Sequence, residues 1–439
     1  MKKQALLLIL GATTALMPVH AEDNDLSSQS EDTKETSKIT EILSRFTVGG
    51  YGEAVYSYNF YSDKYTRYLY PENYKNETHG RFDLPHVVIY LGYDFGKGWT
   101  MGSEIEFEHG GTESAIEIEE EEAGEYESEI ERGGEVALEQ FWIQKSIFPQ
   151  LNIRIGHIIV PVGGTNQHHM PTEFFGVYRP EGENTILPCT WHETGISVWG
   201  RAGDWRYEAL LIPGLDSDRF GRMGWIHDGS GSPYEFKIGN ALAGAFRIDN
   251  YSVKGLRLSV SGYIGNSFSN TLSGNKDNTR YEGVKGTVAI GAFDFNYTGY
   301  NCIVRGNFDY GYLSDAEAIS KANANMSQNS PSSHQTVASA AIAGGIEAGY
   351  NIFAHIPSLC KKGQKFYLFG RYDYYDSMHK TSTPLYEYCG RSRIAAGINY
   401  YPLKEIVLKG EYSIGLLKAP YNNEPAVSIG IAYAGFFTK

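Results

Sequence analysis

The sequence predicts an all-β protein, a transmembrane antiparallel β-barrel of about sixteen strands with a short N-terminal helix. From residue 47 onward, runs of about ten residues alternate apolar with small or polar side chains. In residues 86–95, for example, Val87, Ile89 and Leu91 fall on one face. No strong helical pattern interrupts these runs. So many strands with one apolar and one polar face favour a closed barrel, with lipid outside and water inside.

The N-terminus predicts export from the cytoplasm. Lys2 and Lys3 precede the short apolar run 5–10, and Val19-His20-Ala21 is a small-residue cleavage site. This pattern is typical of a secretory signal peptide, which we place at residues 1–21. The apolar run is too short and too interrupted to cross a bilayer. An exported chain with membrane-type strands is expected to stop in the outer membrane.

Residues 22–46 are expected to form a disordered leader and a short periplasmic helix. The first part is polar and charged, which disfavours a packed core. Within 38–46, the spacing of Ile39, Ile42 and Leu43 places apolar side chains on one helical face.

The barrel is predicted over residues 47–439, with short turns at the periplasmic end and long polar loops at the outer end. An even number of strands then places both barrel termini on the periplasmic side. The last strand keeps the two-residue period up to an aromatic residue, Phe437. The predicted strands are 47–59, 84–95, 99–109, 135–147, 150–162, 187–201, 204–213, 235–248, 255–266, 283–294, 301–312, 335–352, 364–376, 389–401, 405–417 and 425–437.

Charge and cysteine content leave two questions open. The formal net charge is −14, and thirteen Glu lie between residues 104 and 132. Such a block is typical of a solvated loop, the alternative being a cation-gathering or divalent-ion site that bridges to lipopolysaccharide. The four cysteines match no zinc motif. Cys302 and Cys360 are predicted on neighbouring periplasmic turns, where they either form a disulfide or remain free thiols.

One stretch of the chain carries a family resemblance. The elements IRIGHIIVPVG (153–163), QHHMPTEFFGVYRP (167–180) and LPCTWHETGISVWG (187–200) resemble Gram-negative outer-membrane porins related to the phosphate-selective porin O and P family. The resemblance implies a water-filled, sixteen-stranded, homotrimeric porin. It does not extend to the solute, because phosphate selectivity needs a dense lumenal ladder of Lys and Arg and this chain is acidic overall.

The same stretch contains a candidate constriction loop, residues 163–187, between two long predicted strands. In large porins the loop at this position folds into the lumen. Phe174, Phe175 and Tyr178 are expected to pack on the wall. An adjacent His pair is more often incidental than a metal site, so we expect no metal there. The polar side chains expected to face water are His168, His169, Glu173, Arg179, Glu181 and Glu183.

The alternation of each strand assigns charged side chains to the lumen. A lipid-facing Arg or Lys costs roughly 2–4 kcal/mol at the midplane, so lumenal placement is energetically required. Two interpretations remain, a transverse electric field that sets ion preference and a polar lining of mutually paired charges. The predicted lumenal basic residues are Arg154, Arg247, Arg257, Arg305, Arg371, Arg391, Arg393 and Lys409. The acidic ones are Glu104, Glu106, Glu108, Glu139 and Glu193.

The function that the sequence favours is that of an outer-membrane porin, through which small hydrophilic solutes or ions diffuse passively. Outer-membrane lipid and lipopolysaccharide are the expected surroundings, and no nucleic acid, cofactor or metal is expected. The alternatives are a surface adhesin or antigen and an outer-membrane barrel enzyme. Thr190, His192 and Glu193 are the nearest catalytic candidates, and their sequence forms no recognisable triad. We therefore expect the protein not to be an enzyme.

Overall fold

The computed structural model describes residues 41–110, 136–232, 236–271, 281–325, 336–381 and 387–437. The predicted signal peptide, nearly all of the leader, and residues 111–135 of the acidic loop lie outside the described residues. Two compact units are present, Met1–Arg45 and Phe46–Lys439. In the first, residues 41–44 are helical, and Arg45 pairs with Glu41 at 3.0 Å. The predicted short helix is therefore present, and Phe46 already belongs to the first strand.

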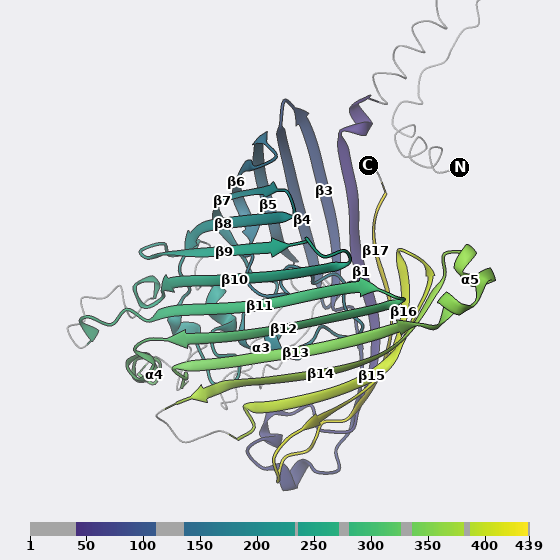
Figure 1. Ribbon diagram of the computed structural model, residues 1–439. Helices are drawn as coiled ribbons and strands as arrows, with labels where there is room; N and C mark the ends of the chain where they lie inside the picture. Colours follow the sequence, from purple (N-terminus) through teal and green to yellow (C-terminus); the bar gives the residue numbers. More distant parts are fainter. Residues whose placement is uncertain are drawn as a thin grey trace, which may run out of the picture. The chain divides into compact units, whose positions relative to one another are not determined.

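The second unit is a ring of antiparallel strands (Figure 1). Their bounds are β1 (Phe46–Asn59), β2 (His79–Asp83), β3 (His86–Gly96), β4 (Trp99–Glu108), β5 (Val136–Phe148), β6 (Leu151–Ile159), β7 (His192–Ala202), β8 (Trp205–Pro213), β9 (Leu242–Asn250), β10 (Leu256–Asn266), β11 (Thr287–Gly299), β12 (Cys302–Leu313), β13 (Ala340–Asn351), β14 (Lys365–Lys380), β15 (Gly390–Leu403), β16 (Ile406–Leu416) and β17 (Ala426–Phe436).

Short helices lie in the connections between strands. They are α3 (Glu181–Ile186), α4 (Ala316–Asn323) and α5 (Pro357–Lys361), with the 3-10 turns η2 (Tyr65–Arg67), η3 (Pro71–Tyr74), η4 (Ser217–Arg219), η5 (His227–Ser230), η6 (Phe268–Asn270) and η8 (Ile352–His355).

The first and last strands close the barrel. β1 pairs with β17 from Gly49↔Phe436 to Asn59↔Ala426, and the two strands lie side by side in Figure 1. On its other side β1 pairs with β3 and then with β2. β2 and β3 thus occupy one strand position in the barrel. The strand is interrupted at Leu84-Pro85, because proline cannot donate a ladder hydrogen bond. Counted this way the barrel has sixteen strands, and the predicted fold class is confirmed.

Some strand boundaries differ from the predicted ones. β9 begins at Leu242 rather than at 235, because the nearby N–H of Ala241 donates to the Asn270 side chain instead of to a strand. β6 ends at Ile159 and β7 begins at His192, which leaves a longer connection than the predicted 163–187. The apolar residues at both ends of that connection are buried inside the barrel, a tertiary contact that period-two alternation cannot distinguish from a strand.

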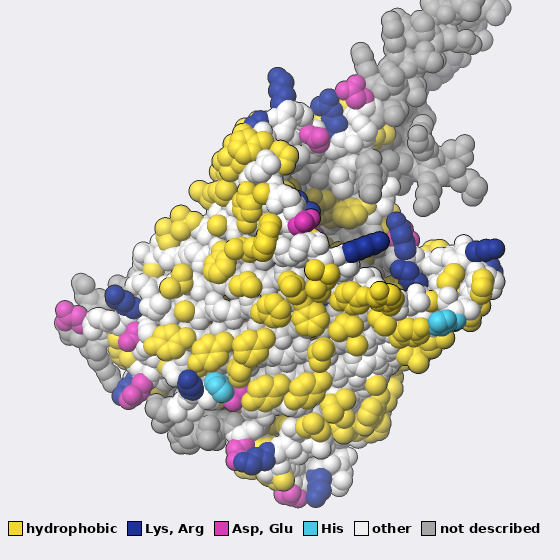
Figure 2. Space-filling view, in the orientation of Figure 1, with side chains coloured by type: hydrophobic (Ala, Val, Ile, Leu, Met, Phe, Trp, Pro, Cys, Tyr) yellow, Lys and Arg dark blue, Asp and Glu magenta, His cyan; other side chains and the backbone are white. Residues whose placement is uncertain are grey.

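The outer face of the barrel is apolar. Figure 2 shows hydrophobic side chains spread across the strands, while most charged side chains gather at the two ends. No helix among the described residues is long and apolar enough to span a membrane. Large apolar side chains that are exposed on the strands include Leu91, Ile155, Leu211, Phe246, Val260, Ile264, Phe308, Ile346, Leu368, Ile398, Leu408 and Ile431. A closed barrel with this outer surface places it against lipid.

The short turns adopt conformations that their residues favour. Tyr300 and Asn301 have φ values of 50° and 63°, the left-handed pair of a tight hairpin turn. The connection between β13 and β14 is longer, because it carries η8 and α5. There the Cys360 thiol donates to the Phe353 carbonyl oxygen at 3.0 Å. Of the two open alternatives for Cys302 and Cys360, the structure has free thiols.

The lipid-facing surface generates a prediction about stability. Val260 is 51% exposed in the middle of β10, and Val260→Arg would place a charge in the hydrocarbon region. We expect it to lower the free energy of unfolding from lipid vesicles by about 2–4 kcal/mol. The control is Val253→Arg, since Val253 is 55% exposed in the turn before β10. Equal effects of the two substitutions in urea titrations would contradict a membrane boundary between these sites.

Candidate functional site

The connection between β6 and β7, residues 160–191, crosses the barrel interior, and we call it the pore segment. The Gly163 N–H donates to Ser261 Oγ on β10 at 3.0 Å. The Phe175 N–H donates to the Glu347 carboxylate on β13 at 3.2 Å. Lys409 on β16 donates to the Gly176 carbonyl oxygen at 2.7 Å. One short segment reaches strands so far apart around the ring only by running inside it, where Figure 1 shows α3.

The start of the pore segment is anchored on the Glu183 carboxylate. Its oxygens accept hydrogen bonds from the N–H groups of Gly164, Thr165 and Asn166 at 2.9, 2.9 and 3.2 Å. The Asn166 side chain joins both ends of the segment, because its amide donates to the Val160 carbonyl oxygen and its oxygen accepts from the Trp191 N–H, each at 2.6 Å. Burial raises the pKa of Glu183 to about 7, although the three N–H donors oppose the rise.

Gly163 is required by this anchor. Its φ is +81°, and a Cβ at this position would lie 2.2 Å from the Glu183 carboxylate. Only glycine satisfies both the backbone conformation and the close approach.

The middle of the segment is fixed by aromatic and charged contacts. Phe175 is 1% exposed and stacks on Phe369 at a centroid distance of 5.4 Å. Lys409 lies 4.0 Å from the centroid of the Phe174 ring. The expected packing of Phe174 and Phe175 on the wall is therefore present. The N–H of Val177 donates to Glu411 on β16, which ties the segment to that side of the barrel.

One side of the interior is filled by apolar packing. Trp191 and Trp225 are fully buried and belong to one core with residues from β6 to β14, the pore segment and the loop after β8. Inward residues of these strands, such as Ile158, Ile212 and Ile290, join this core near the outer end. The interior is therefore not polar throughout.

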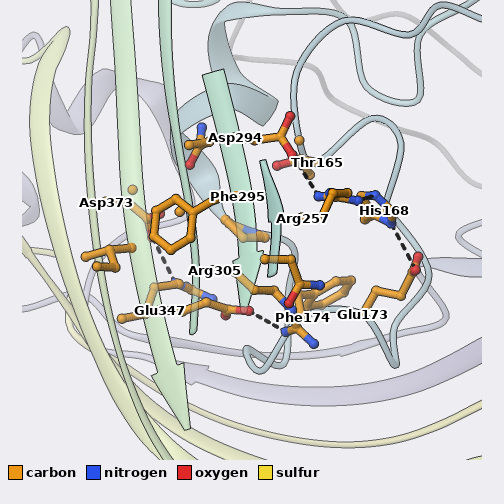
Figure 3. Close-up of a pocket in the computed structure, with 18 of the residues that line it drawn as sticks. Thr165, His168, Glu173, Phe174, Arg257, Asp294, Phe295, Arg305, Glu347 and Asp373 are labelled. Atoms are coloured by element: carbon orange, nitrogen blue, oxygen red, sulfur yellow. Dashed lines mark hydrogen bonds and ion pairs between the residues drawn. The ribbon is translucent and has the colours of Figure 1, made fainter. Parts of the chain in front are cut away.

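Three cavities with polar linings lie beside the pore segment. An outer cavity of about 450 Å³ and a middle cavity of about 160 Å³ share Tyr61, Glu181 and Arg393 in their linings. An inner cavity of about 170 Å³ shares Arg371 with the middle cavity. Figure 3 shows the inner cavity, where Arg305 pairs with Glu347. Neighbouring cavities thus share lining residues, Arg393 between the outer and middle cavities and Arg371 between the middle and inner cavities.

The predicted basic residues all lie beside interior partners. Arg154 donates to Gln144, and its guanidinium lies 4.6 Å from the Trp142 ring centroid. The others contact carboxylates or carbonyl oxygens: Arg247 with Asp249 and Asp294, Arg257 with Asp294 and His168, Arg305 with Glu347, Arg371 with Asp373 and Glu411, Arg391 with Glu424, Arg393 with Glu181 and Glu424, and Lys409 with Phe174 and Gly176.

Most of these acidic partners were missed by sequence reasoning. Asp249 follows Arg247 by two residues, and Asp373 and Glu411 follow Arg371 and Lys409 in the same way. Residues two apart on a strand share a face, so the assignment that placed the cations inside also placed these carboxylates inside. Compensated pairs, rather than a purely basic wall on β14–β16, line this side.

The loop carboxylate Glu424 completes the pairing at the outer cavity. Burial opposes its ionisation, but Arg391 and Arg67 together hold the pKa of Glu424 below its usual range. Arg67 Nε lies 3.1 Å from Glu424, and Arg391 lies 3.3 Å from it.

The predicted acidic residues on β4 and β5 have few cationic partners. Glu104 accepts from Gln140, Glu106 is 3% exposed, and Glu139 is fully buried. The register between β4 and β5 shifts after Glu104↔Gln140, so that Glu139 is an extra, bulged residue. Glu108 lies opposite His86 on β3.

The catalytic candidates do not form a relay. His192 bonds to His157 through ring nitrogens 2.5 Å apart, whereas Glu193 pairs with Lys237. No nucleophile–histidine–carboxylate chain joins Thr190, His192 and Glu193 among the contacts of the described residues.

The polar residues of the pore segment also have defined partners. His168 bonds to Glu173 at 3.0 Å, and His169 bonds to the Asn166 carbonyl oxygen at 2.9 Å. Burial opposes ionisation of Glu173, but its bond to His168 keeps the pKa of Glu173 below the usual value. Burial also lowers the pKa of His169, which favours the neutral ring. Arg179 donates to Thr190, and Glu181 accepts from Tyr375.

Comparison with known proteins agrees with this architecture. No family model matches the chain. A protein of Aquifex aeolicus, described only as uncharacterised, is 26% identical over 394 residues, which cover 86% of this chain and 77% of that protein. The similar solved structures include an anion-selective porin from Comamonas acidovorans, with a TM-score of 0.51, 11% identity, and coverage of 89% of this chain and 99% of that one.

Two further structures have the same fold. The outer membrane channel DcaP of Acinetobacter baumannii has a TM-score of 0.51 and 10% identity, over 89% of this chain and 97% of that chain. OmpF of Salmonella typhi, in complex with daunomycin, has a TM-score of 0.53 and 12% identity, over 88% and 97%. The chain is an outer-membrane β-barrel. Its closed sheet and apolar outer surface suit a membrane, because only helices and closed barrels satisfy their backbone within lipid.

The Gly163 anchor generates a prediction. Gly163→Ala combines left-handed backbone strain with a clash against Glu183, whereas Gly363→Ala, at φ +73°, meets no atom within 4 Å. Strain alone costs roughly 1–2 kcal/mol, and the clash adds about 1–3 kcal/mol at Gly163. Urea unfolding of both variants measures the difference. Equal destabilisation would show that the segment does not hold Gly163 against Glu183.

The raised pKa of Glu183 generates a pH prediction. The folded protein holds the Glu183 proton more tightly than the unfolded chain, so the stabilisation from this proton is fully present below the unfolded pKa. It is lost as the pH rises toward the folded pKa of about 7. We therefore expect the wild type to lose more unfolding free energy than Glu183→Gln between pH 4.5 and 7. Parallel pH profiles of the two proteins would refute this assignment.

Proposed function

We propose that this protein is a porin, through which small hydrophilic solutes or ions diffuse passively. The observation that carries the proposal is the series of three polar cavities beside the pore segment, each of which shares lining residues with the next. Solutes that enter the outer cavity meet the Arg393–Glu181 pair and then Arg371. The pore segment acts as the constriction in this proposal, because it narrows the interior from the wall of β10 across to that of β16.

Charge at the constriction supports a local preference for anions. The middle cavity is lined by four arginines and two carboxylates, namely Arg81, Arg179, Arg371, Arg393, Glu181 and Glu411. The charged residues lining the inner cavity are mixed, with Glu173, Asp294, Glu347 and Asp373 beside Arg257, Arg305 and Arg371. Rings of charge set ion preference in a narrow pore. We propose weak anion preference at the middle cavity, within a barrel whose net charge is acidic.

The finer resemblance, to phosphate-selective porins, is not needed for this proposal. The arginines that line the cavities of this barrel have nearby carboxylates, as in Arg371 with Asp373 and Arg393 with Glu181. Such compensation favours passage of varied small anions over tight capture of one oxyanion.

Planar-bilayer recordings test the function and the role of Arg393 together. Arg393 Nε lies 2.7 Å from Glu181, at the junction of the outer and middle cavities. Arg393→Ala removes both bulk and positive charge there. We expect larger single-channel steps and, in a KCl gradient, a reversal potential shifted toward cation preference.

Two further variants interpret the recordings. Arg393→Lys keeps the charge and is expected to retain the wild-type ion preference. Arg201→Ala removes an exposed arginine at the end of β7 and is expected to leave conductance unchanged. Wild-type protein without conductance would overturn the porin proposal. An unchanged reversal potential in Arg393→Ala would instead remove Arg393 from the selectivity of a working pore.

A further inference from the structure

The barrel wall carries a second cluster, away from the three cavities, on β3 and β4. His86 begins β3 and lies directly opposite Glu108, the last residue of β4. Glu106 lies two residues before Glu108 and therefore shares its face. One ligand-capable atom from each of these three side chains lies within 4.8 Å of the others. The His86 imidazole and the Glu106 and Glu108 carboxylates thus lie together where β3 begins and β4 ends.

His86 is oriented as a metal-bound histidine commonly is. Its Nδ1 lies 2.8 Å from a carboxylate oxygen of Glu53 on β1. With Nδ1 donating to Glu53, the Nε2 lone pair is the one left for a ligand. A carboxylate that holds the remote ring nitrogen fixes both the tautomer and the ring orientation.

Glu106 supplies an independent observation that points to a bound cation. Its side chain is 3% exposed, and its Oε1 has no hydrogen-bond partner among the described residues. The neighbouring bulged residue Glu139 is fully buried and likewise has an unpartnered Oε1. An unpartnered buried carboxylate oxygen is costly, and pairing with a cation or a metal removes that cost.

The available protein cation does not satisfy these oxygens. Arg179 of the pore segment interacts electrostatically with Glu106 and Glu139. Its hydrogen bond, however, goes to Thr190 Oγ1, and its Nε and Nη2 atoms are unpartnered. No hydrogen bond or ion pair among the described residues joins the Arg179 guanidinium to these carboxylates.

We propose that His86, Glu106 and Glu108 bind a divalent transition-metal ion, with Zn²⁺ the best-matched probe. One imidazole nitrogen with carboxylate oxygens suits Zn²⁺, whereas Ca²⁺ and Mg²⁺ select oxygen ligands alone. Tetrahedral bonds of about 2.1 Å place ligand atoms about 3.4 Å apart. Ligand atoms that lie within 4.8 Å of one another reach this geometry by side-chain shifts of about 1 Å or less. Three protein ligands leave a position open to water or to a fourth carboxylate.

A Zn²⁺ titration of the full-length, refolded barrel against a competing colour indicator tests the site. We expect about one tight Zn²⁺ per wild-type chain and at least tenfold weaker binding in His86→Ala and in Glu106→Gln. Glu53→Gln leaves all three ligands in place and is expected to weaken binding about 10–100-fold, because a neutral amide replaces the carboxylate that orients His86 and raises its basicity.

Matched controls separate this cluster from other sites. His355→Ala and Glu317→Gln alter an exposed-rim histidine and an exposed glutamate elsewhere, and both are expected to bind Zn²⁺ as the wild type does. Zn²⁺ binding that is unchanged in His86→Ala and displaced by millimolar Ca²⁺ would assign the ion to oxygen ligands of the acidic loop and overturn the proposal. Absence of tight Zn²⁺ binding to the wild type would also overturn it.

Folding of each variant is checked separately, and the metal readout does not depend on conductance. The heat-sensitive mobility of a closed barrel on gels reports folding. Co²⁺ in place of Zn²⁺ gives a visible spectrum that reports nitrogen ligation in the wild type. Loss of the spectrum in folded Glu53→Gln or His86→Ala supports the site, whereas an unaltered spectrum in both contradicts it. A wild-type barrel that binds Zn²⁺ but shows no conductance would support the metal site and overturn the porin proposal.

Discussion

Closure of β1 on β17 is the constraint on which the rest of the structure depends. In hydrocarbon every backbone N–H and C=O must find a partner, so a sheet in lipid has no permissible edge. Closure fixes one face of every strand toward lipid and the other toward the interior. Charged residues in the middle of the strands are thereby collected inside one ring, and their properties depend on how they pair there.

A ring of sixteen strands is too wide for wall side chains to fill, and the pore segment determines how the remaining space is used. Its buried Trp191 joins the apolar core on one side, and its Gly176 carbonyl meets Lys409 on the other. The two ends are clamped by Asn166, and Glu183 holds the first turn through backbone N–H groups. The segment therefore takes part both in an apolar core and in the lining of polar cavities.

The interior charges fall into two different groups. On β9 to β16, arginines and carboxylates alternate along strands and across them, as in Arg371 with Asp373, so the polar side is compensated yet rich in donors and acceptors. On β4 and β5, Glu106 and Glu139 each keep a buried oxygen that has no hydrogen-bond partner among the described residues. The first group suits the passage of mobile solutes, and the second suits a fixed cation, because a buried unpaired carboxylate must be either protonated or matched by positive charge.

The sequence by itself determined the barrel, its strand number and its apolar outer face, because period-two alternation is a local property that each strand carries in full. It also indicated which cations lie inside. It did not reveal that Val160 and Leu187 leave the strands to pack within the barrel, since both continue the apolar pattern. Nor did it reveal that the Glu183 carboxylate accepts a hydrogen bond from the Gly164 N–H. It also did not reveal that His86 lies opposite Glu108 and bonds to Glu53. Those pairings depend on register and on the path of one long connection, and only the closed tertiary structure decides which distant residues share an interior.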